Sequence, residues 1–339
     1  MNAHKIKEFL YENGYPLYRF KQVEKGIYLD FRKNFPDIKE LPEELRKQLA
    51  ENFSVLSFST GEILESPSGE AVKALLVLKD GKKIESVILN KSCGEWAVCV
   101  STQVGCPVRC KFCYSGRYGL KRNLSSEEIS DQVLFWGQFL KEKESGKLSS
   151  VVYMGMGEPF LNYENVVESV KILNSCMGMG KRHISVSTVG HVPNIRRFAR
   201  DLPQVNLAIS LHSASDEKRN ELVPFNLKYP LSQLSRAVKD YLDSAKRKIF
   251  IEYVMLAGIN DKEKDARKLV KWIKDTHLKR YFTVNLIPYN QTGGEFRIPE
   301  KENMRAFQNL LILNGIEATI RKSLGSDIRG ACGQLANKR

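Results

Sequence analysis

Three cysteines stand close together in the segment VGCPVRCKFCYSG, residues 104–116, at Cys106, Cys110 and Cys113. One loop with this spacing can bring three thiolates to a common centre, as in a metal or iron–sulfur site. Such sites usually take four protein ligands, and no obvious fourth ligand lies nearby. A four-iron cluster held by three cysteines leaves one iron free for a small molecule. The alternative is a structural zinc site completed by a distant Cys or His, although such sites normally show paired CxxC units and the chain has only five histidines.

The pattern CxxxCxxC, with Phe112 before the last cysteine, resembles the signature of radical S-adenosylmethionine (SAM) enzymes. The resemblance implies a [4Fe-4S] cluster on Cys106, Cys110 and Cys113. Its open iron would bind the amino and carboxylate groups of SAM, and an electron from the cluster would cleave SAM to a 5′-deoxyadenosyl radical. The cofactor then carries the difficult chemistry, and the protein positions it.

Other polar residues follow predicted strands further along the chain. The segment MGMGEP, residues 154–159, is similar to the glycine-rich motif of the same superfamily. Gly157 would let the backbone approach the methionine moiety of SAM, and Glu158 would accept a hydrogen bond from its ammonium group. Each polar residue taken alone is more often structural. As a set at one barrel mouth they could bind SAM, and the further candidates for this set are Ser187, Ser210 with Leu211 and His212, and Asn290.

The elements that must position these residues alternate between strand and helix after Cys99. Strands are predicted at 96–104, 150–156, 183–189, 205–212, 249–256 and 282–289. Helices are predicted between them, and the first, over 125–144, begins with a capping box of Ser125 and Glu128. Six such repeats predict an α/β fold with a parallel sheet, a partial (β/α)6 TIM-like barrel of the radical SAM type. Ligands of these folds bind at the carboxyl ends of the strands.

The first ninety residues read differently. Helical spacing of apolar residues covers 4–15 and 41–53, and strand-like runs at 71–78 and 84–89 flank the turn signal Asp80-Gly81. We therefore expect a small helical and β accessory domain over residues 1–90, which would bind RNA. The radical SAM core would span 91–339 and end in a Gly-rich loop that carries Cys332.

The charge of the chain favours a polyanionic partner. Lys and Arg number 53 and Asp and Glu number 39, which gives a net charge of +14. A basic solvated surface is the alternative, but the basic residues cluster near the cysteines and elsewhere. No apolar leader or long apolar run is present, and seven cysteines suit a reducing compartment. We expect a cytoplasmic protein with no membrane contact.

Seven motifs together resemble the RlmN/Cfr family of RNA adenine methyltransferases over about residues 85 to 335. They are CVSTQVGC, GLKRNL, MGMGEP, ISLHS, EYVMLAGIND, VNLIPYN and DIRGACGQL. This family methylates an sp² carbon of adenine, which has no nucleophilic lone pair, and so needs radical chemistry. The resemblance implies two SAM molecules per turnover, 23S rRNA and tRNA as substrates, and an electron donor such as flavodoxin. We expect the chain to act as a monomer.

The resemblance also implies roles for three residues outside the cluster motif. Cys332 would be methylated by one SAM, lose a hydrogen to the radical from a second, and add to the adenine as a methylene radical. Glu85 would accept the ring proton, although its spacing to Cys99 is about one residue longer than the family pattern. The Cys99 thiolate would then attack the Cys332 sulfur and release the product, leaving a transient disulfide.

Some cysteines and one segment match nothing in the family. We interpret Cys93 and Cys176 as ordinary thiols. Tyr114-Ser115-Gly116 departs from the Ala-Thr or Ser-Thr that is common after the cluster motif, and we expect it to alter packing without touching the cluster ligands or the Cys99–Cys332 pair.

Two related activities differ in the carbon that they methylate. RlmN-type enzymes act on C2 of adenine 2503 in 23S rRNA, and many also act on C2 of adenine 37 in tRNA. Cfr-type enzymes act on C8 of the same rRNA adenine and confer antibiotic resistance. Pro159 favours the RlmN type, because Cfr-like sequences tend to carry Ala there. A radical SAM enzyme with a non-RNA substrate and a non-catalytic RNA-binding iron–sulfur protein remain as further alternatives.

Overall fold

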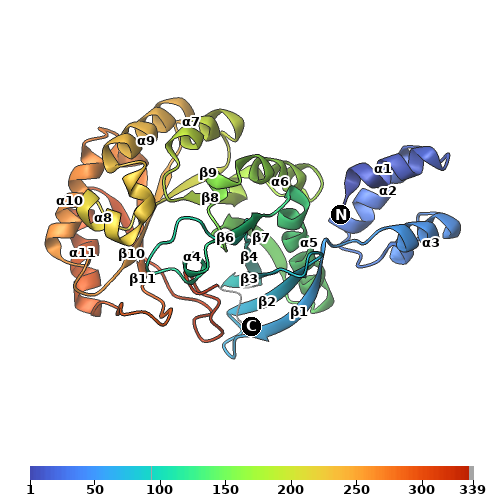
Figure 1. Cartoon of the computed structure of the whole chain (residues 1–339), viewed down its shortest axis with the longest axis horizontal. Coiled ribbons are helices and arrows are strands. Elements are labelled where there is room, and N and C mark those ends of the chain that lie inside the picture. Colours follow the sequence, from blue (N-terminus) through green and yellow to red (C-terminus); the bar gives the residue numbers. More distant parts are fainter. Residues whose placement is uncertain (93, 336–339) are drawn as a thin grey trace.

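The computed structural model describes residues 1–92 and 94–335 of the chain. Within this part, one sheet contains ten strands in the order β1-β2-β3-β4-β7-β8-β9-β10-β11-β12, and β5 pairs with β6 separately (Figure 1). The strands are β1 (Phe58–Glu65), β2 (Ala71–Leu78), β3 (Lys83–Ser92), β4 (Glu95–Cys99), β5 (Gln103–Gly105), β6 (Leu120–Asn123), β7 (Lys147–Tyr153), β8 (Ile184–Thr188), β9 (Asn206–Ser210), β10 (Ile249–Met255), β11 (Phe282–Pro288) and β12 (Glu317–Ile320).

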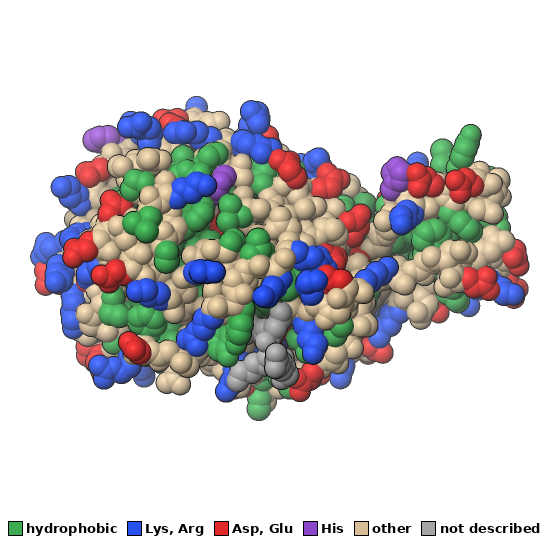
Figure 2. Space-filling model, in the orientation of Figure 1, with side chains coloured by type: hydrophobic (Ala, Val, Ile, Leu, Met, Phe, Trp, Pro, Cys, Tyr) green, Lys and Arg blue, Asp and Glu red, His purple; other side chains and the backbone are tan. Residues whose placement is uncertain are grey.

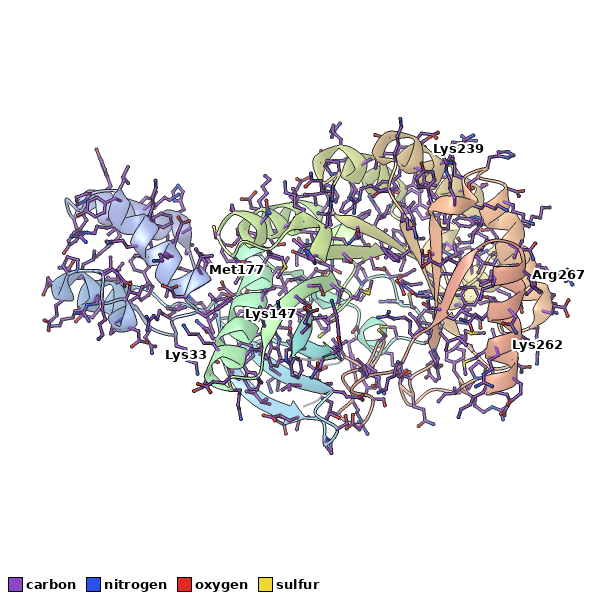
Figure 3. The ribbon with its side chains drawn as sticks, turned by 180° about the vertical axis from the view of Figure 1, so that it is seen from behind. Lys33, Lys147, Met177, Lys239, Lys262 and Arg267 are labelled. Carbon is purple, nitrogen blue, oxygen red and sulfur yellow. The ribbon has the colours of Figure 1, made fainter. Side chains whose placement is uncertain are left out.

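Helices connect the strands and cover the outer face of the sheet. Seen from behind, Lys239 and Arg267 lie on these outer helices, and Lys262 immediately precedes one of them (Figure 3). The helices are α1 (Ala3–Glu12), α2 (Tyr18–Glu24), α3 (Glu43–Asn52), α4 (Tyr114–Arg117), α5 (Ser126–Glu142), α6 (Tyr163–Ser175), α7 (Val192–Asp201), α8 (Asp216–Leu222), α9 (Leu231–Ala245), α10 (Glu263–Lys274) and α11 (Lys301–Leu313).

Parallel pairing runs through the larger part of the sheet, from β4 and β7 to β12. Apolar side chains of the strands, such as Val186, Ile251 and Val284, are fully buried in one large cluster with the inner faces of the helices. The predicted partial barrel is confirmed. With β12 at its edge, the parallel part of the sheet contains seven strands among the described residues.

The predicted cap of the first long helix is present at α5. The Ser125 hydroxyl accepts from the Glu128 amide at 3.2 Å, and the Glu128 carboxylate accepts from the Ser125 amide at 2.9 Å. These bonds satisfy two amides that the first turn leaves without helical partners, and they fix the start of α5. Ile129, Val133 and Trp136 on the inner face of α5 are fully or almost fully buried.

The N-terminal region contains two differently packed parts. Helices α1 to α3 form their own apolar cluster with residues up to Val55, and α5 contributes Leu134 to it. By contrast, β1 to β3 are antiparallel strands that extend the barrel sheet and share its core. The helical part lies beside α5 in Figure 1. The division at residue 90 stays a prediction, but the packing changes near residue 55.

Two ion pairs join the helical part to α5. The buried ammonium group of Met1 lies 2.6 Å from the Asp131 carboxylate, which also accepts from the Ser57 amide at 2.9 Å. Lys33, labelled at this junction in Figure 3, pairs with Glu142 at 2.6 Å. Charged contacts therefore supplement the apolar contact at Leu134.

No helix in the described ranges combines the length and the apolar character needed to cross a membrane.

Candidate active site

The loop between β5 and α4 carries Cys106, Cys110 and Cys113, and all three line one pocket at the carboxyl ends of the strands. Gly105 adopts a φ of +78°, and a Cβ atom there would lie 1.9 Å from the Gly119 carbonyl oxygen. Only glycine fits at this position, so the β5–β6 pair can hold the cysteine loop tightly. The predicted grouping of the three cysteines in one loop is thus present.

The donor set suits an iron–sulfur cluster. Burial raises the pKa of each thiol, and for Cys106 and Cys110 the neighbouring cysteines raise it further. Three thiolates so close together and buried therefore need a positively charged partner. Backbone amides donate toward the sulfurs of Cys106 and Cys113, as they do in iron–sulfur sites. Within residues 1–92 and 94–335 no group of three His, Cys, Asp or Glu side chains is arranged to hold a single metal ion.

We call the pocket that contains these cysteines the inner pocket. It brings together residues from seven segments that are far apart in the sequence. The predicted site residues that line it are Cys106, Cys110, Cys113, Gly157, Glu158, Ser187, Ser210, His212, Asn290 and Cys332.

The MGMGEP segment packs against the chain that follows β4. Gly157 has a φ of +104°, and a Cβ atom there would lie 2.7 Å from the Gln103 side chain. The Gln103 Oε1 atom accepts from the Glu158 amide at 2.9 Å. Gln103 was not singled out from the sequence, and its side chain explains why this turn needs glycine.

Glu158 is almost fully buried, and its carboxylate is held by backbone donors. Oε1 accepts from the Phe160 amide at 3.0 Å and Oε2 from the Val189 amide at 2.9 Å. Burial nevertheless raises its pKa to about 7, because the hydrogen bonds only partly offset the loss of solvation. Glu158 therefore joins the ends of β7 and β8 and presents a carboxyl group to the inner pocket.

Ser187 and Ser210 lie on neighbouring strands, and their hydroxyls are 2.9 Å apart. His212 follows with a φ of +58°, and its Nδ1 atom accepts from the Val254 amide at 3.1 Å. Burial, with a smaller contribution from Arg219, lowers the pKa of His212 to about 3, so the ring is neutral and carries its proton on Nε2. Leu211 does not line the inner pocket, because its side chain is fully buried in the core.

Arg219 on α8 was missed by the sequence analysis. Its guanidinium group is 1% exposed and donates to the Leu211 carbonyl at 2.9 Å, to the Asn226 side chain, and to carbonyls at the ends of β8 and β9. Burial lowers its pKa to about 10, so it stays protonated at neutral pH. The stretch SASDEKRNELV reads as an exposed helix, and nothing local in it signals this burial.

Cys332 lies in the segment after β12, residues 321–335, which we call the strap. Asn290 donates to the Cys332 carbonyl at 3.1 Å, so this predicted SAM contact also supports the strap. The Tyr114 amide donates to the Gly333 carbonyl at 2.8 Å, and the Ser115 hydroxyl donates to the Leu335 carbonyl at 2.6 Å. The cysteine loop and the strap are therefore bonded together.

These bonds correct one expectation. Tyr114-Ser115-Gly116 was expected to touch neither the cluster ligands nor the cysteine pair. In the structure Ser115 and Gly116 donate toward the Cys113 sulfur, and Tyr114 and Ser115 bind the strap next to Cys332. The expectation was wrong because the strap, more than two hundred residues later in the sequence, folds onto α4.

The strap also binds the strands at the opposite edge of the sheet. The Ser66 hydroxyl donates to Asp327 at 2.6 Å, Lys73 donates to the Arg329 carbonyl at 3.4 Å, and Lys322 pairs with Glu70. It thus runs from β12 to the β1–β2 hairpin across the open side of the barrel.

Cys99 and Cys332 are both free thiols in the structure. Cys99 ends β4 outside the residues that line the inner pocket, but its thiol is close enough to Cys332 for the two to interact electrostatically. Burial raises the pKa of Cys99, and the Cys332 thiol adds to the effect. Cys332 is exposed as a residue, yet desolvation of its thiol and the Glu252 carboxylate raise its pKa to about 11. Both are protonated at neutral pH.

Glu252 of β10 is a second residue that was missed. It lines the inner pocket, is nearly buried, and accepts from the Asn285 side chain at 2.8 Å. Burial raises its pKa to about 6. A single carboxylate in the apolar run IFIEYVML was the available signal.

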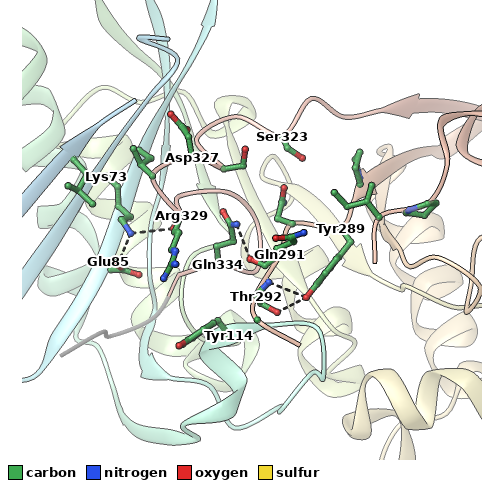
Figure 4. Close-up of a pocket in the computed structure, with 18 of the residues that line it drawn as sticks. Lys73, Glu85, Tyr114, Tyr289, Gln291, Thr292, Ser323, Asp327, Arg329 and Gln334 are labelled. Atoms are coloured by element: carbon green, nitrogen blue, oxygen red, sulfur yellow. Dashed lines mark hydrogen bonds and ion pairs between the residues drawn. The ribbon is translucent and has the colours of Figure 1, made fainter. Parts of the chain in front are cut away.

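A larger cavity lies next to the inner pocket and shares Tyr289 and Asn290 with it. We call it the outer cavity. Figure 4 shows Lys73 and Glu85 on one side of it, Tyr114 on another and the strap residues between them. Glu85 is nearly buried, and its carboxylate lies 3.0 Å from the Lys73 ammonium group. Glu85 lines the outer cavity and is not among the residues that line the inner pocket. It thus borders the space beside the strap that carries Cys332.

Cys176 lies between α6 and the helical part, away from the inner pocket, and Cys93 is outside the described residues.

Comparisons with known proteins agree with this geometry. The model of the radical SAM superfamily matches residues 100–270. A probable dual-specificity RNA methyltransferase RlmN from Caldicellulosiruptor saccharolyticus is 41% identical, covering 98% of this chain and 94% of its own. A ribosomal RNA large subunit methyltransferase Cfr from Lachnoclostridium phytofermentans is 37% identical, covering 98% and 97%. A crystal structure of a radical SAM methyltransferase from Sphaerobacter thermophilus superposes with a TM-score of 0.93 and 38% identity, covering 99% and 97%.

Proposed function

Because the chain belongs to the RlmN/Cfr family of radical SAM RNA methyltransferases, we propose that it methylates C2 of adenine 2503 in 23S rRNA, and also C2 of adenine 37 in tRNA. The observation that carries the proposal is the strap, which brings Cys332 into the same pocket as Cys106, Cys110 and Cys113. An enzyme that needs only a cluster and SAM has no use for a further thiol there.

Superfamily membership implies a [4Fe-4S] cluster and SAM. Cys106, Cys110 and Cys113 would hold the cluster, which supplies the electron that cleaves SAM to a 5′-deoxyadenosyl radical. Gly157, Glu158, Ser187, Ser210, His212 and Asn290 would contact SAM along the inner pocket, and the main chain at Leu211 would support them. The neutral His212 ring offers an Nε2 donor, while the Glu158 carboxyl group offers an acceptor for an ammonium group.

Two SAM molecules would be used in each turnover, the first to methylate the Cys332 sulfur. The carbon of this S-methyl group would then bond to the adenine while it is still attached to the sulfur. Cys332 would thereby be linked covalently to the RNA. For release, the Cys99 thiol would lose its proton and attack the Cys332 sulfur. The bond from that sulfur to the transferred carbon would break, and the carbon would take the electron pair and a proton to become the methyl group. A disulfide between the two cysteines would remain on the protein. The closeness of these two thiols supports this step.

Glu85 would take the ring proton of the adenine. Its place on the wall of the outer cavity supports this role, because an RNA base could enter there beside the strap. The Lys73 ammonium group 3.0 Å away favours the ionised carboxylate, which is the form that accepts a proton.

The RNA would be held mainly through its backbone and shape. The net charge of +14 supports this, and Figure 2 shows Lys and Arg side chains spread over the central part of the face seen in Figure 1. Residues 1–90 would contribute to the RNA surface. We propose a cytoplasmic monomer that receives electrons from a donor such as flavodoxin.

C8 methylation of the same rRNA adenine is the second candidate. The Cfr relative, 37% identical over nearly the whole chain, favours it. Pro159 favours C2 instead. Mass spectrometry of rRNA and tRNA from cells with and without the gene tests both, because it resolves 2-methyladenosine from 8-methyladenosine. We expect 2-methyladenosine to disappear with the gene. Loss of 8-methyladenosine would establish the second candidate, and loss of neither would contradict both.

A further inference from the structure

Two tyrosines and an arginine lie together beside the outer cavity. The Tyr114 and Tyr118 rings have centroids 5.8 Å apart and are tilted by 38°. The Arg117 guanidinium carbon lies 5.0 Å from the centre of the Tyr114 ring. Tyr114 and Arg117 line the outer cavity, and Tyr118 is 54% exposed just outside it. The three side chains form one surface with aromatic and guanidinium faces, which we call the aromatic ledge.

The aromatic ledge is fixed by bonds to the parts of the chain that build the site. The Tyr114 amide donates to the Gly333 carbonyl of the strap at 2.8 Å, and the Arg117 guanidinium group donates to the Thr292 hydroxyl at 3.4 Å. The Tyr118 hydroxyl lies 3.4 Å from the Tyr114 hydroxyl. The Tyr114 backbone and the Arg117 side chain are therefore anchored before any ligand arrives, which lowers the entropy cost of stacking on them.

Three of the cations near the ledge form no ion pair with a described residue. Among the described residues no carboxylate forms an ion pair with Arg117, Lys111 or Lys121, and all three side chains are exposed. Arg122, the neighbouring cation, instead pairs with Asp80 and Glu128. The cations around the ledge are therefore available to an anionic ligand such as a phosphate.

We propose that the aromatic ledge stacks one unpaired RNA base, the neighbour of the base that enters the outer cavity. Unpaired RNA bases are recognised by stacking on aromatic rings and on guanidinium planes, with cations meeting the backbone phosphates. The aromatic ledge and the cations around it offer aromatic rings, a guanidinium plane and positive charge. These groups lie beside the cavity wall at Tyr114, where the neighbouring nucleotide would lie. This inference rests on the proposed function and identifies a contact that the methyl transfer itself does not require.

The test uses a stem–loop RNA with an unpaired adenine in its loop and 2-aminopurine at the nucleotide on either side, one side at a time. Stacking quenches 2-aminopurine fluorescence. We expect the wild-type protein to quench one of the two probes, and Tyr118→Ala to lose the quench and bind about tenfold more weakly. Tyr118→Phe keeps the ring and should restore both. Because Tyr118 is exposed and outside the apolar core, its removal leaves the fold intact.

A matched pair of arginines separates stacking from simple charge loss. The Arg280 guanidinium carbon also lies 5.0 Å from a tyrosine ring, that of Tyr281, but at the opposite end of β11 from the site. Arg117→Ala should reduce the quench, while Arg280→Ala removes the same charge and should preserve it. An unquenched wild-type complex, an unchanged quench in Tyr118→Ala, or equal loss in Arg280→Ala would overturn the proposal and favour a protein-binding role for these tyrosines.

The same RNA, incubated with SAM and a reductant, reports on the proposed function separately. Methylation of the loop adenine by the wild-type protein supports that function, and its absence counts against it. The fluorescence quench tests the stacking of a base on the aromatic ledge in either case, because it measures binding and not turnover.

Discussion

The inner pocket and the outer cavity meet at Tyr289 and Asn290 but hold their charged groups differently. In the inner pocket, Glu158 and Glu252 form no ion pair with another described residue, and burial raises the pKa of both. In the outer cavity, Glu85 is paired with Lys73. Burial thus brings the pKa of both inner-pocket carboxyl groups closer to neutrality than that of a solvated carboxyl group. In the outer cavity, the Lys73 ammonium group 3.0 Å away offsets part of the cost of burying the Glu85 carboxylate.

Replacing Cys332 and Cys99 should have the largest effect. Cys332→Ala should reduce RNA methylation to background, because no sulfur remains to carry the methyl group, while iron content and 5′-deoxyadenosine formation persist. Cys99→Ala should instead trap the covalent link between Cys332 and RNA, visible as a shifted band in a denaturing gel. Methylation by Cys332→Ala, measured with labelled SAM, would contradict the two-cysteine scheme.

A change at Glu85 separates the outer cavity from the inner pocket in function. Glu85→Gln should slow methylation by about 10²- to 10⁴-fold, because general-base catalysis is lost. Methylation of Cys332, which needs no base from the outer cavity, should be unchanged when followed by peptide mass spectrometry. Equal loss of RNA methylation and of Cys332 methylation would mean that Glu85 also acts on the reaction in the inner pocket. The two cavities would then not differ in function at Glu85.

The ion pair in the outer cavity should matter for stability. Lys73→Met leaves the nearly buried Glu85 carboxylate without its lysine, and we expect a loss of about 3 kcal/mol in the free energy of unfolding. Urea denaturation measures it. The double variant Lys73→Met/Glu85→Gln removes the charge as well and should recover most of the loss. No recovery would mean that Lys73 stabilises the fold by packing alone.

The smallest expected effect is a pH dependence from the inner pocket. The pKa of Glu252 rises from its ordinary value of 4.5 to about 6 in the folded protein. The folded state then holds this proton more tightly than the unfolded state, so its contribution to stability is full below pH 4.5 and is lost as pH rises through about 6.

Glu252→Gln has no such titration and should gain about 2 kcal/mol relative to the wild type between pH 4 and pH 8. Urea denaturation at both pH values measures the difference. Glu302→Gln, on the rim of the outer cavity, removes the same charge and serves as the control. An equal pH effect in both variants would assign it to overall charge and not to burial.

Site residues that belong to local motifs could be predicted from the sequence. Residues whose role depends on packing between distant segments could not. The cysteine motif, MGMGEP and the strand-end serines could be found because their spacing reflects one turn or one strand each. Arg219 escaped notice because its burial depends on carbonyls of β8 and β9, which helix α8 meets only in the folded chain. The role of Ser115 escaped for the same reason, since Leu335 reaches it through the strap.

The sheet extension shows the same limit. Strand character in 71–78 and 84–89 was predicted correctly, but nothing in those runs indicates that β3 pairs with β4 and so continues the barrel. Pairing partners are decided by which edge is free, and that depends on the whole sheet.

The strap connects the two free edges of the sheet before it reaches the site. The sheet has free edges at β1 and β12; the strap leaves β12, and its middle, at Asp327 and Arg329, is bound to Ser66 and Lys73. Its last residues, from Cys332 to Leu335, lie against Asn290 and α4. Cys332 is therefore held from two sides, and its position depends both on the β1–β2 edge of the sheet and on the cysteine loop.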